Sequence, residues 1–152
     1  MSDVICILPV DPNDEKVQAI IEELSAHLLL RFGSDGKNSF TGWQADNPDF
    51  VFVIAKINTE IVGCGAIRPI DKNTGEVKRM YSKLPRKKIG QTILAVLEEK
   101  AKIIGYTNLI LETRVNNKEA VLFYQKQGYS QIPNYGKYIG RMEAVCFGKS
   151  LT

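Results

Sequence analysis

A cluster of positive side chains lies directly before a glycine in the middle of the chain. Arg86, Lys87 and Lys88 follow a short alternating segment, and Gly90 opens a long amphipathic stretch. The first N–H groups of a helix have no partner inside the helix, and the helix dipole adds about half a positive charge there. These residue types in this order predict a phosphate-binding turn at a helix N-terminus, with a merely solvated basic turn as the alternative.

A second set of residues, further along the chain, has a spacing typical of a short helix. Asn117, Ala120, Tyr124 and Gly128 lie within the segment NNKEAVLFYQKQGY. Gly128 suits the C-terminal end of that helix. Tyr124 on its own would be interpreted as a half-buried aromatic side chain, so its chemical meaning depends on the residues around it.

The elements that must position these residues can be predicted from hydrophobic periodicity. Strands are expected at 4–10, 49–58, 60–70, 76–81, 106–113 and 143–151, and helices at 14–33, 90–104 and 117–128. The two strands that flank the middle helix should pair in parallel through a right-handed crossover, within an otherwise antiparallel sheet. The chain is therefore predicted to form a single domain, residues 1–152, without a repeat or linker.

The bulk composition argues against several classes of protein. The 44% hydrophobic and 24% charged residues are typical of a globular chain. A net charge of +3 is small for a nucleic-acid binder, so no nucleic-acid partner is expected. No apolar stretch approaches the ~20 residues that span a bilayer, and Met1-Ser2-Asp3 does not begin a signal peptide. We therefore expect a cytoplasmic protein without a membrane partner.

The cysteines and the single histidine suggest no metal site. Cys6, Cys64 and Cys146 are far apart, lie in apolar runs and have no metal-ligand spacing. They are expected to be buried, reduced thiols. His27 lies close to two leucines of the first helix and is interpreted as a partly buried structural side chain rather than a base.

Taken together, the strand KRMY, the basic turn, the helix after it and the Asn-x-x-Ala…Tyr…Gly-Tyr spacing resemble the GNAT superfamily of N-acetyltransferases. The resemblance covers roughly residues 50–150 and is closest to small bacterial members that contain GCGAIRP, EVKRMY, LET and PNYGxY…VCF. It implies the acyl-CoA N-acyltransferase fold, an α/β (α+β) mixed sheet of about seven strands with helices on both faces. It also implies acetyl-CoA as co-substrate.

The resemblance assigns cofactor contacts to particular residues. The pyrophosphate would lie against Arg86, Lys87, Lys88, Ile89, Gly90 and Gln91. The two central strands splay apart in the family, and the backbone of Met80 and Tyr81 would then bond the pantetheine arm. Asn117 would bond the same arm, and Tyr124 would contact it and donate a proton to the thiolate leaving group.

The basic turn departs from the family's [R/Q]-x-x-G-x-[G/A] motif. Pro85 stands where the family has Arg or Gln, and Lys88 stands where it has its first Gly. A side chain at Lys88 disfavours a turn with positive φ. The alternative function is therefore a non-catalytic sensor or partner protein that binds (acyl-)CoA with a degenerate pyrophosphate loop.

The acceptor implied by the resemblance is a primary amine, on a small molecule or a peptide, that attacks acetyl-CoA directly. Glu76 is the first candidate for the base that takes the amine's proton, and Glu112 is the second; either could instead be an ordinary strand-end charge. Trp43, Tyr135 and Tyr138 are candidate acceptor contacts, with simple packing of their loops as the alternative. A homodimer is possible.

Overall fold

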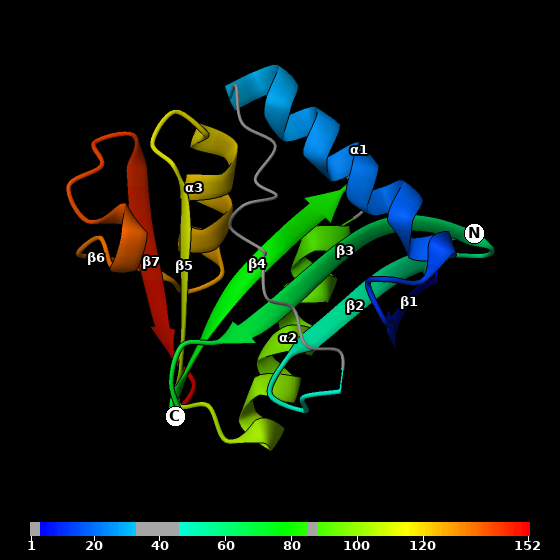
Figure 1. The fold of residues 1–152 in the computed structure, drawn as a ribbon, viewed down its shortest axis with the longest axis horizontal. Coiled ribbons are helices and arrows are strands. Elements are labelled where there is room, and N and C mark those ends of the chain that lie inside the picture. The colour runs from blue at the N-terminus through cyan, green and yellow to red at the C-terminus, as the bar shows by residue number, and fades with distance from the viewer. Residues whose placement is uncertain (1–3, 33–45, 85–87) are drawn as a thin grey trace.

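The computed structural model describes residues 4–32, 46–84 and 88–152. Its central feature is a seven-stranded sheet with the order β1-β2-β3-β4-β5-β7-β6 (Figure 1). The strands are β1 (Ile5–Pro9), β2 (Val51–Ile57), β3 (Glu60–Pro69), β4 (Thr74–Ser82), β5 (Asn108–Arg114), β6 (Ser130–Ile132) and β7 (Ala144–Ser150). The helices are α1 (Glu15–Phe32), α2 (Ile89–Ile104) and α3 (Lys118–Lys126), with a 3-10 turn η3 at Gly136–Tyr138. Among these described strands, only β4 and β5 pair in parallel, as predicted.

The predicted elements are confirmed, with small shifts at their ends. Helix α2 begins at Ile89 rather than Gly90, and it ends at the expected glycine, Gly105, which has a φ of 114°. Strand β6 lies between the predicted helix 117–128 and the predicted strand 143–151, where no strand is predicted. It pairs with β7, but three residues are too few to show alternation, so periodicity could not reveal it.

Helices cover both faces of the sheet, which confirms the predicted layers. Helix α1 packs Val17, Ile20 and Leu24 against one face. Helices α2 and α3 lie on the other face, where Ile93 and Leu97 belong to the larger hydrophobic cluster. Each face therefore has its own core, and the sheet is the middle of three layers.

The sheet divides between β4 and β5. Their parallel ladder ends after three residue pairs, Thr74↔Asn108, Gly75↔Leu109 and Glu76↔Ile110. Figure 1 shows the two strands meeting near the lower end of the sheet and diverging above it. We call this opening the fork; its arms are residues 77–82 of β4 and residues 111–114 of β5.

A β-bulge in β4 explains the divergence. The register between β3 and β4 shifts so that Arg79 and Met80 together lie opposite Gly65. Arg79 is in the left-handed region of backbone space, with a φ of 56°. A bulge bends its strand and increases the local twist, and this turns the upper part of β4 away from β5.

A side chain at Gly65 would disturb both the bulge and the packing of α2. A Cβ atom there would lie 2.7 Å from Met80 Sδ and 2.6 Å from Ile93 Cγ2. We expect Gly65→Ala to lower the free energy of unfolding by about 1–3 kcal/mol through overpacking, measured by urea denaturation. Gly148→Ala in β7 is the control, because a Cβ atom there meets no atom closer than 3.3 Å. Equal losses in the two variants would contradict this explanation.

Two expectations about single side chains are wrong. Cys6 is exposed because Ile5 and Ile7, on either side of it in β1, point to the core and it points the other way, whereas Cys64 and Cys146 are buried. His27 is exposed rather than partly buried, and its ring centroid lies 5.9 Å from that of Tyr81. None of the described helices is long and apolar enough to cross a membrane.

Candidate active site

The N-terminal end of α2 lies beside the β4 arm of the fork. A Cβ atom built on Gly63 would lie 2.6 Å from the carbonyl oxygen of Tyr81 and 2.9 Å from Ile89 Cγ2, so β4 and the first turn of α2 meet there. A Cβ atom on Gly90 would lie 3.4 Å from the ring of Phe123 in α3. The N–H groups at the start of α2, which lack helical partners, are therefore close to both β4 and α3.

Lys88 is the N-cap residue of α2 and adopts the left-handed conformation, with a φ of 58° and a ψ of 25°. This is the position at which the family motif has a glycine. Lys88 adopts this conformation in spite of its side chain, at a cost of roughly 1–2 kcal/mol. The backbone at Lys88 thus has a conformation typical of glycine, and its exposed side chain adds a positive charge beside the helix N-terminus.

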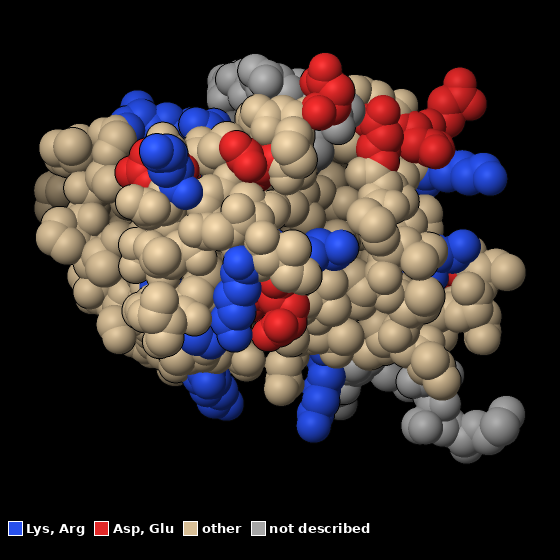
Figure 2. All heavy atoms as spheres, turned by 90° about the horizontal axis from the view of Figure 1, so that it is seen from below, with Lys and Arg blue, Asp and Glu red and all other residues tan. Residues whose placement is uncertain are grey.

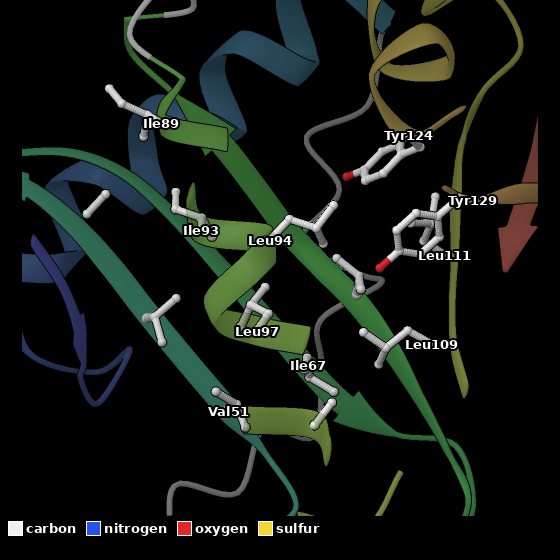
Figure 3. Packing of buried hydrophobic residues seen from close by; sticks show 14 of the residues in the cluster. Val51, Ile67, Ile89, Ile93, Leu94, Leu97, Leu109, Leu111, Tyr124 and Tyr129 are labelled. Carbon is white, nitrogen blue, oxygen red and sulfur yellow. The ribbon is translucent and has the colours of Figure 1, made fainter. Parts of the chain in front are cut away.

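Tyr124 extends from α3 into the fork, with its hydroxyl group pointing toward β4 (Figure 3). The residue is 8% exposed, and its ring centroid lies 5.1 Å from that of Phe123 and 5.7 Å from that of Tyr129. Burial raises the pKa of Tyr124, so the phenol keeps its proton at neutral pH. It can therefore act as a proton donor to a group that lies in the fork.

Asn117 caps the N-terminus of α3. Its Oδ1 atom accepts a hydrogen bond of 3.2 Å from the N–H of Ala120. Helix capping therefore gives the Asn-x-x-Ala spacing a local structural reason. A bond from Asn117 to a pantetheine arm stays a prediction, and the Nδ2 group is the part of the side chain that would make it.

Glu76 is the centre of a buried charge network on the α1 face of the sheet. The residue is 3% exposed, and its Oε1 atom lies 3.3 Å from Arg68 Nε. Its Oε2 atom accepts a hydrogen bond of 2.5 Å from the Tyr135 hydroxyl and lies 3.6 Å from Lys78 Nζ. The first candidate base is therefore an internal ion-pair partner, and the interpretation as an ordinary strand-end charge is wrong.

Lys78 belongs to the same charge network and is not among the residues predicted for the site. Its Nζ atom donates a hydrogen bond of 2.8 Å to the Tyr138 hydroxyl and lies 5.5 Å from the centroid of that ring. Burial lowers the pKa of Lys78, and the negative charge of Glu76 opposes this effect. The sequence pattern that could have predicted this contact is the pair Glu76 and Lys78. Alternate residues of a strand share a face, so these opposite charges lie on the same side.

The two tyrosines predicted to contact the acceptor lie together over the sheet. Tyr135 and Tyr138 pack edge-on with a centroid distance of 5.5 Å, and Tyr138 also packs against Ala144 and Cys146 of β7. Burial raises the pKa of both tyrosines, so both hydroxyl groups stay protonated. Their hydroxyl groups bond to residues of β4, as described above, while their rings cover the same face of the sheet.

Glu112 lies on the β5 arm of the fork and is half-buried. Its neighbour Leu111 points into the α2 and α3 core, so Glu112 faces the α1 side, as Glu76 does. Burial raises the pKa of Glu112, while the cations of Lys78 and Arg114 oppose the shift. A carboxylate whose pKa is closer to neutral is a more effective general base.

Trp43, Arg86 and Lys87 lie outside the described residues.

A surface hollow of about 520 Å³, lined partly by Lys100 and Ile103 near the C-terminal end of α2, contains none of the predicted site residues. No group of three potential metal-ligating side chains occurs in the described part of the chain. On the face shown in Figure 2, Lys and Arg side chains are interspersed with Asp and Glu.

Comparison with known proteins defines the class. A model of the Acetyltransferase (GNAT) family matches residues 17–129. The chain is 30% identical over 137 residues to a protein named IAA acetyltransferase from Azospirillum brasilense, with 88% of this chain and 90% of that protein covered.

Solved structures share the fold across nearly the whole chain. One, from Klebsiella pneumoniae and assigned as an acyl-CoA N-acyltransferase, has a TM-score of 0.82 and 26% identity, and covers 98% of this chain and 99% of its own. Another, a GNAT acetyltransferase from Elizabethkingia anophelis with acetyl-CoA bound, has a TM-score of 0.70 and 23% identity, with 96% and 97% covered. The fold is that of the acyl-CoA N-acyltransferases. The chain belongs to the GNAT family of acetyltransferases and is an acyltransferase.

Proposed function

We propose that the protein transfers an acetyl group from acetyl-CoA to a primary amine, which attacks the thioester directly. The fork carries this proposal, because its two arms lie apart with Tyr124 between them and the start of α2 beside them. The Elizabethkingia anophelis structure supports the choice of cofactor, since it holds acetyl-CoA within the same fold.

The cofactor would use charge at one end of the fork and backbone groups along it. Its pyrophosphate would lie against the first turn of α2, where the helix dipole and the charge of Lys88 attract an anion. Arg86, Lys87, Ile89, Gly90 and Gln91 would complete that contact. The backbone of Met80 and Tyr81 would bond the pantetheine arm as a neighbouring strand does, and an N–H group near Met80 would polarise the thioester carbonyl.

In the reaction, the neutral amine nitrogen attacks the carbonyl carbon of the thioester, and the C–S bond breaks once the C–N bond has formed. Glu112, directly or through a water molecule, accepts the proton that the nitrogen loses. Tyr124 gives its proton to the departing thiolate, so the products are an amide and coenzyme A. Glu112 then releases a proton to solvent and Tyr124 regains one. We prefer Glu112 to Glu76 as the base because both oxygens of Glu76 already contact other side chains.

The amine would enter from the α1 face, where Glu112 lies. The rings of Tyr135 and Tyr138 would form one wall of its site, and Trp43 would be a further contact. We propose a small-molecule or peptide amine. The names of two similar proteins, the IAA acetyltransferase and a solved aminoglycoside 6'-acetyltransferase, support the small-molecule choice. A homodimer and a cytoplasmic location stay predictions.

An assay of thiol release from acetyl-CoA across amino acids, polyamines, aminoglycosides and peptides tests the proposal. We expect at least one amine to give acetylated product, identified by mass spectrometry, faster than a sample without acceptor. Tight binding of acetyl-CoA with no product from any amine would instead support the non-catalytic coenzyme A sensor.

Two substitutions of Lys88 separate its charge from its backbone conformation. Lys88→Gly should raise the free energy of unfolding by about 1 kcal/mol relative to Lys88→Ala, because glycine adopts a φ of 58° without strain. Both variants lose the cation, so both should raise the Kd of acetyl-CoA, by up to about tenfold or 1.4 kcal/mol. Thermal unfolding and calorimetric titration measure the two effects. A wild-type Kd in both variants would show that Lys88 does not contact the pyrophosphate.

A further inference from the structure

The two parts of the sheet on either side of the fork are joined by more than the short β4–β5 ladder. Tyr135 and Tyr138 belong to the segment between β6 and β7. Their hydroxyl groups nevertheless bond to Glu76 and Lys78 of β4. Because β5 lies between β4 and β7 in the sheet, these two hydrogen bonds connect β4 to a segment whose flanking strands, β6 and β7, are not its neighbours.

The two bonds are located where the fork begins. Glu76 is the last residue of β4 that pairs with β5, and Lys78 is the second residue of the β4 arm. The Tyr135 bond therefore holds β4 at the base of the fork, and the Tyr138 bond holds it just beyond the base. Loss of either bond would therefore affect the position of the β4 arm first.

The segment that carries both tyrosines is itself fixed to β7. The Nδ2 group of Asn134 donates hydrogen bonds to the carbonyl oxygens of Tyr138, Arg141 and Ala144, at 3.1, 3.1 and 3.2 Å. Tyr138 also packs against Ala144 and the fully buried Cys146 of β7. The anchor for the β4 arm is therefore a well-bonded part of the sheet rather than a loosely held loop.

We propose that Tyr135 and Tyr138 are positioning residues that hold the β4 arm at the separation which a pantetheine arm requires. We call the contacts Tyr135–Glu76 and Tyr138–Lys78 the fork clamp. This inference rests on the proposed function, because it takes the fork as the cofactor site. Without the clamp the β4 arm would sample other separations, and the apparent affinity for the cofactor would fall with the fraction of molecules whose fork has the right width.

Phenylalanine variants test the clamp, because they keep the rings and remove only the hydroxyl groups. Tyr135→Phe and Tyr138→Phe should each raise the Kd of acetyl-CoA about tenfold, or 1.4 kcal/mol, in calorimetric titration. Both should also speed hydrogen exchange at the amides of residues 77–82. The loss of a single buried hydrogen bond can change a free energy by the 1.4 kcal/mol expected for the Kd.

Tyr106→Phe is the matched control. Tyr106 is 4% exposed, and its hydroxyl group donates a hydrogen bond of 2.7 Å to the carbonyl oxygen of Asp49. It lies just before β5, at the closed end of the fork. Loss of this hydroxyl group in Tyr106→Phe should lower the melting temperature about as much as the clamp variants do and leave the acetyl-CoA Kd unchanged.

A double variant tests whether Tyr138 acts through Lys78. If the two residues form one contact, Lys78→Met combined with Tyr138→Phe should weaken acetyl-CoA binding no more than Lys78→Met alone. If the Kd increases of the two single variants multiply in the double variant, the two residues act separately. That result would contradict the proposed fork clamp.

Two other results would overturn the proposal. One is a lower melting temperature in the clamp variants with a wild-type acetyl-CoA Kd. The other is a rise in the KM of the acceptor alone, which would assign the hydroxyl groups to acceptor binding. If the wild-type protein bound no acetyl-CoA, the proposed function would fail. Hydrogen exchange at residues 77–82 would then decide the clamp, since it should be faster in Tyr135→Phe and Tyr138→Phe than in Tyr106→Phe.

Discussion

Tyr124→Phe should lower kcat about a hundredfold while the Kd of acetyl-CoA stays within twofold of wild type. The phenyl ring would keep its packing against Phe123 and Tyr129, so the variant loses only the hydroxyl group, whose proton goes to the leaving thiolate in the proposed mechanism. Burial raises the pKa of Tyr124, which keeps that proton on the phenol throughout the neutral range. Thiol release measures kcat, and calorimetric titration measures the Kd.

Tyr129→Phe is the control for this prediction. Tyr129 belongs to the same cluster and is 3% exposed, and its hydroxyl group donates a hydrogen bond of 2.9 Å to Glu98 Oε2. Its loss should cost about 1 kcal/mol of stability and leave kcat unchanged. Full activity in Tyr124→Phe would remove Tyr124 from the mechanism.

Glu112→Gln should lower kcat/KM at neutral pH by about 10²–10³-fold and remove the rising limb of its pH profile. A base must be ionised to accept a proton, so wild-type activity should fall as the pH falls through the raised pKa of Glu112. Glutamine has no such titration, and its remaining activity should follow the ionisation of the amine alone. Steady-state rates between pH 5 and 9 measure the difference. Survival of the limb in Glu112→Gln would falsify the assignment.

Stability separates the two candidate carboxylates. The pKa of Glu112 is raised in the folded state, so its contribution to stability falls as the pH rises through that pKa. Glu112→Gln should therefore be at least as stable as wild type at pH 7. Glu76→Gln should lose up to about 3 kcal/mol, because Lys78 stays buried without its anion. Urea denaturation at pH 7 distinguishes the two effects.

The elements with strong local signals could be predicted from the sequence. The apolar positions Ile89, Ile93 and Leu97 of α2 recur at helical spacing, and all three are buried. The boundary between β2 and β3 and the end of α2 at Gly105 depend on residues within a few positions. These predictions hold because the apolar face that the periodicity indicates is the face that the folded protein buries.

The charge network of the site could not be predicted from local patterns. The Tyr135–Glu76 contact joins residues 59 positions apart, and the Tyr138–Lys78 contact joins residues 60 apart. Charged residues in a strand are usually interpreted as facing solvent. Glu76 is instead buried and Lys78 is half-buried, and the two side chains pair with each other. The expected role of Tyr124 came from the family resemblance, since periodicity marks it only as a helix aromatic.

The backbone conformations of two residues near the fork could not be predicted from the sequence either. The bulge that opens the fork is at Arg79, which has a φ of 56° without being a glycine. Lys88 has a similar conformation at the start of α2, against the expectation for a residue with a Cβ atom. Both residues have a Cβ atom, which normally disfavours positive φ, so the residue type does not predict either conformation.

The short β4–β5 ladder has a consequence for the protein when it carries no coenzyme. Beyond Glu76 and Ile110, each strand has a side that its neighbour does not pair with. Unpaired strand sides can recruit strands from other molecules, which leads to aggregation. Bound coenzyme A would cover these sides, so it would act as a solubilising ligand as well as a reactant. The purified chain should therefore reach higher concentrations without light scattering when coenzyme A is present.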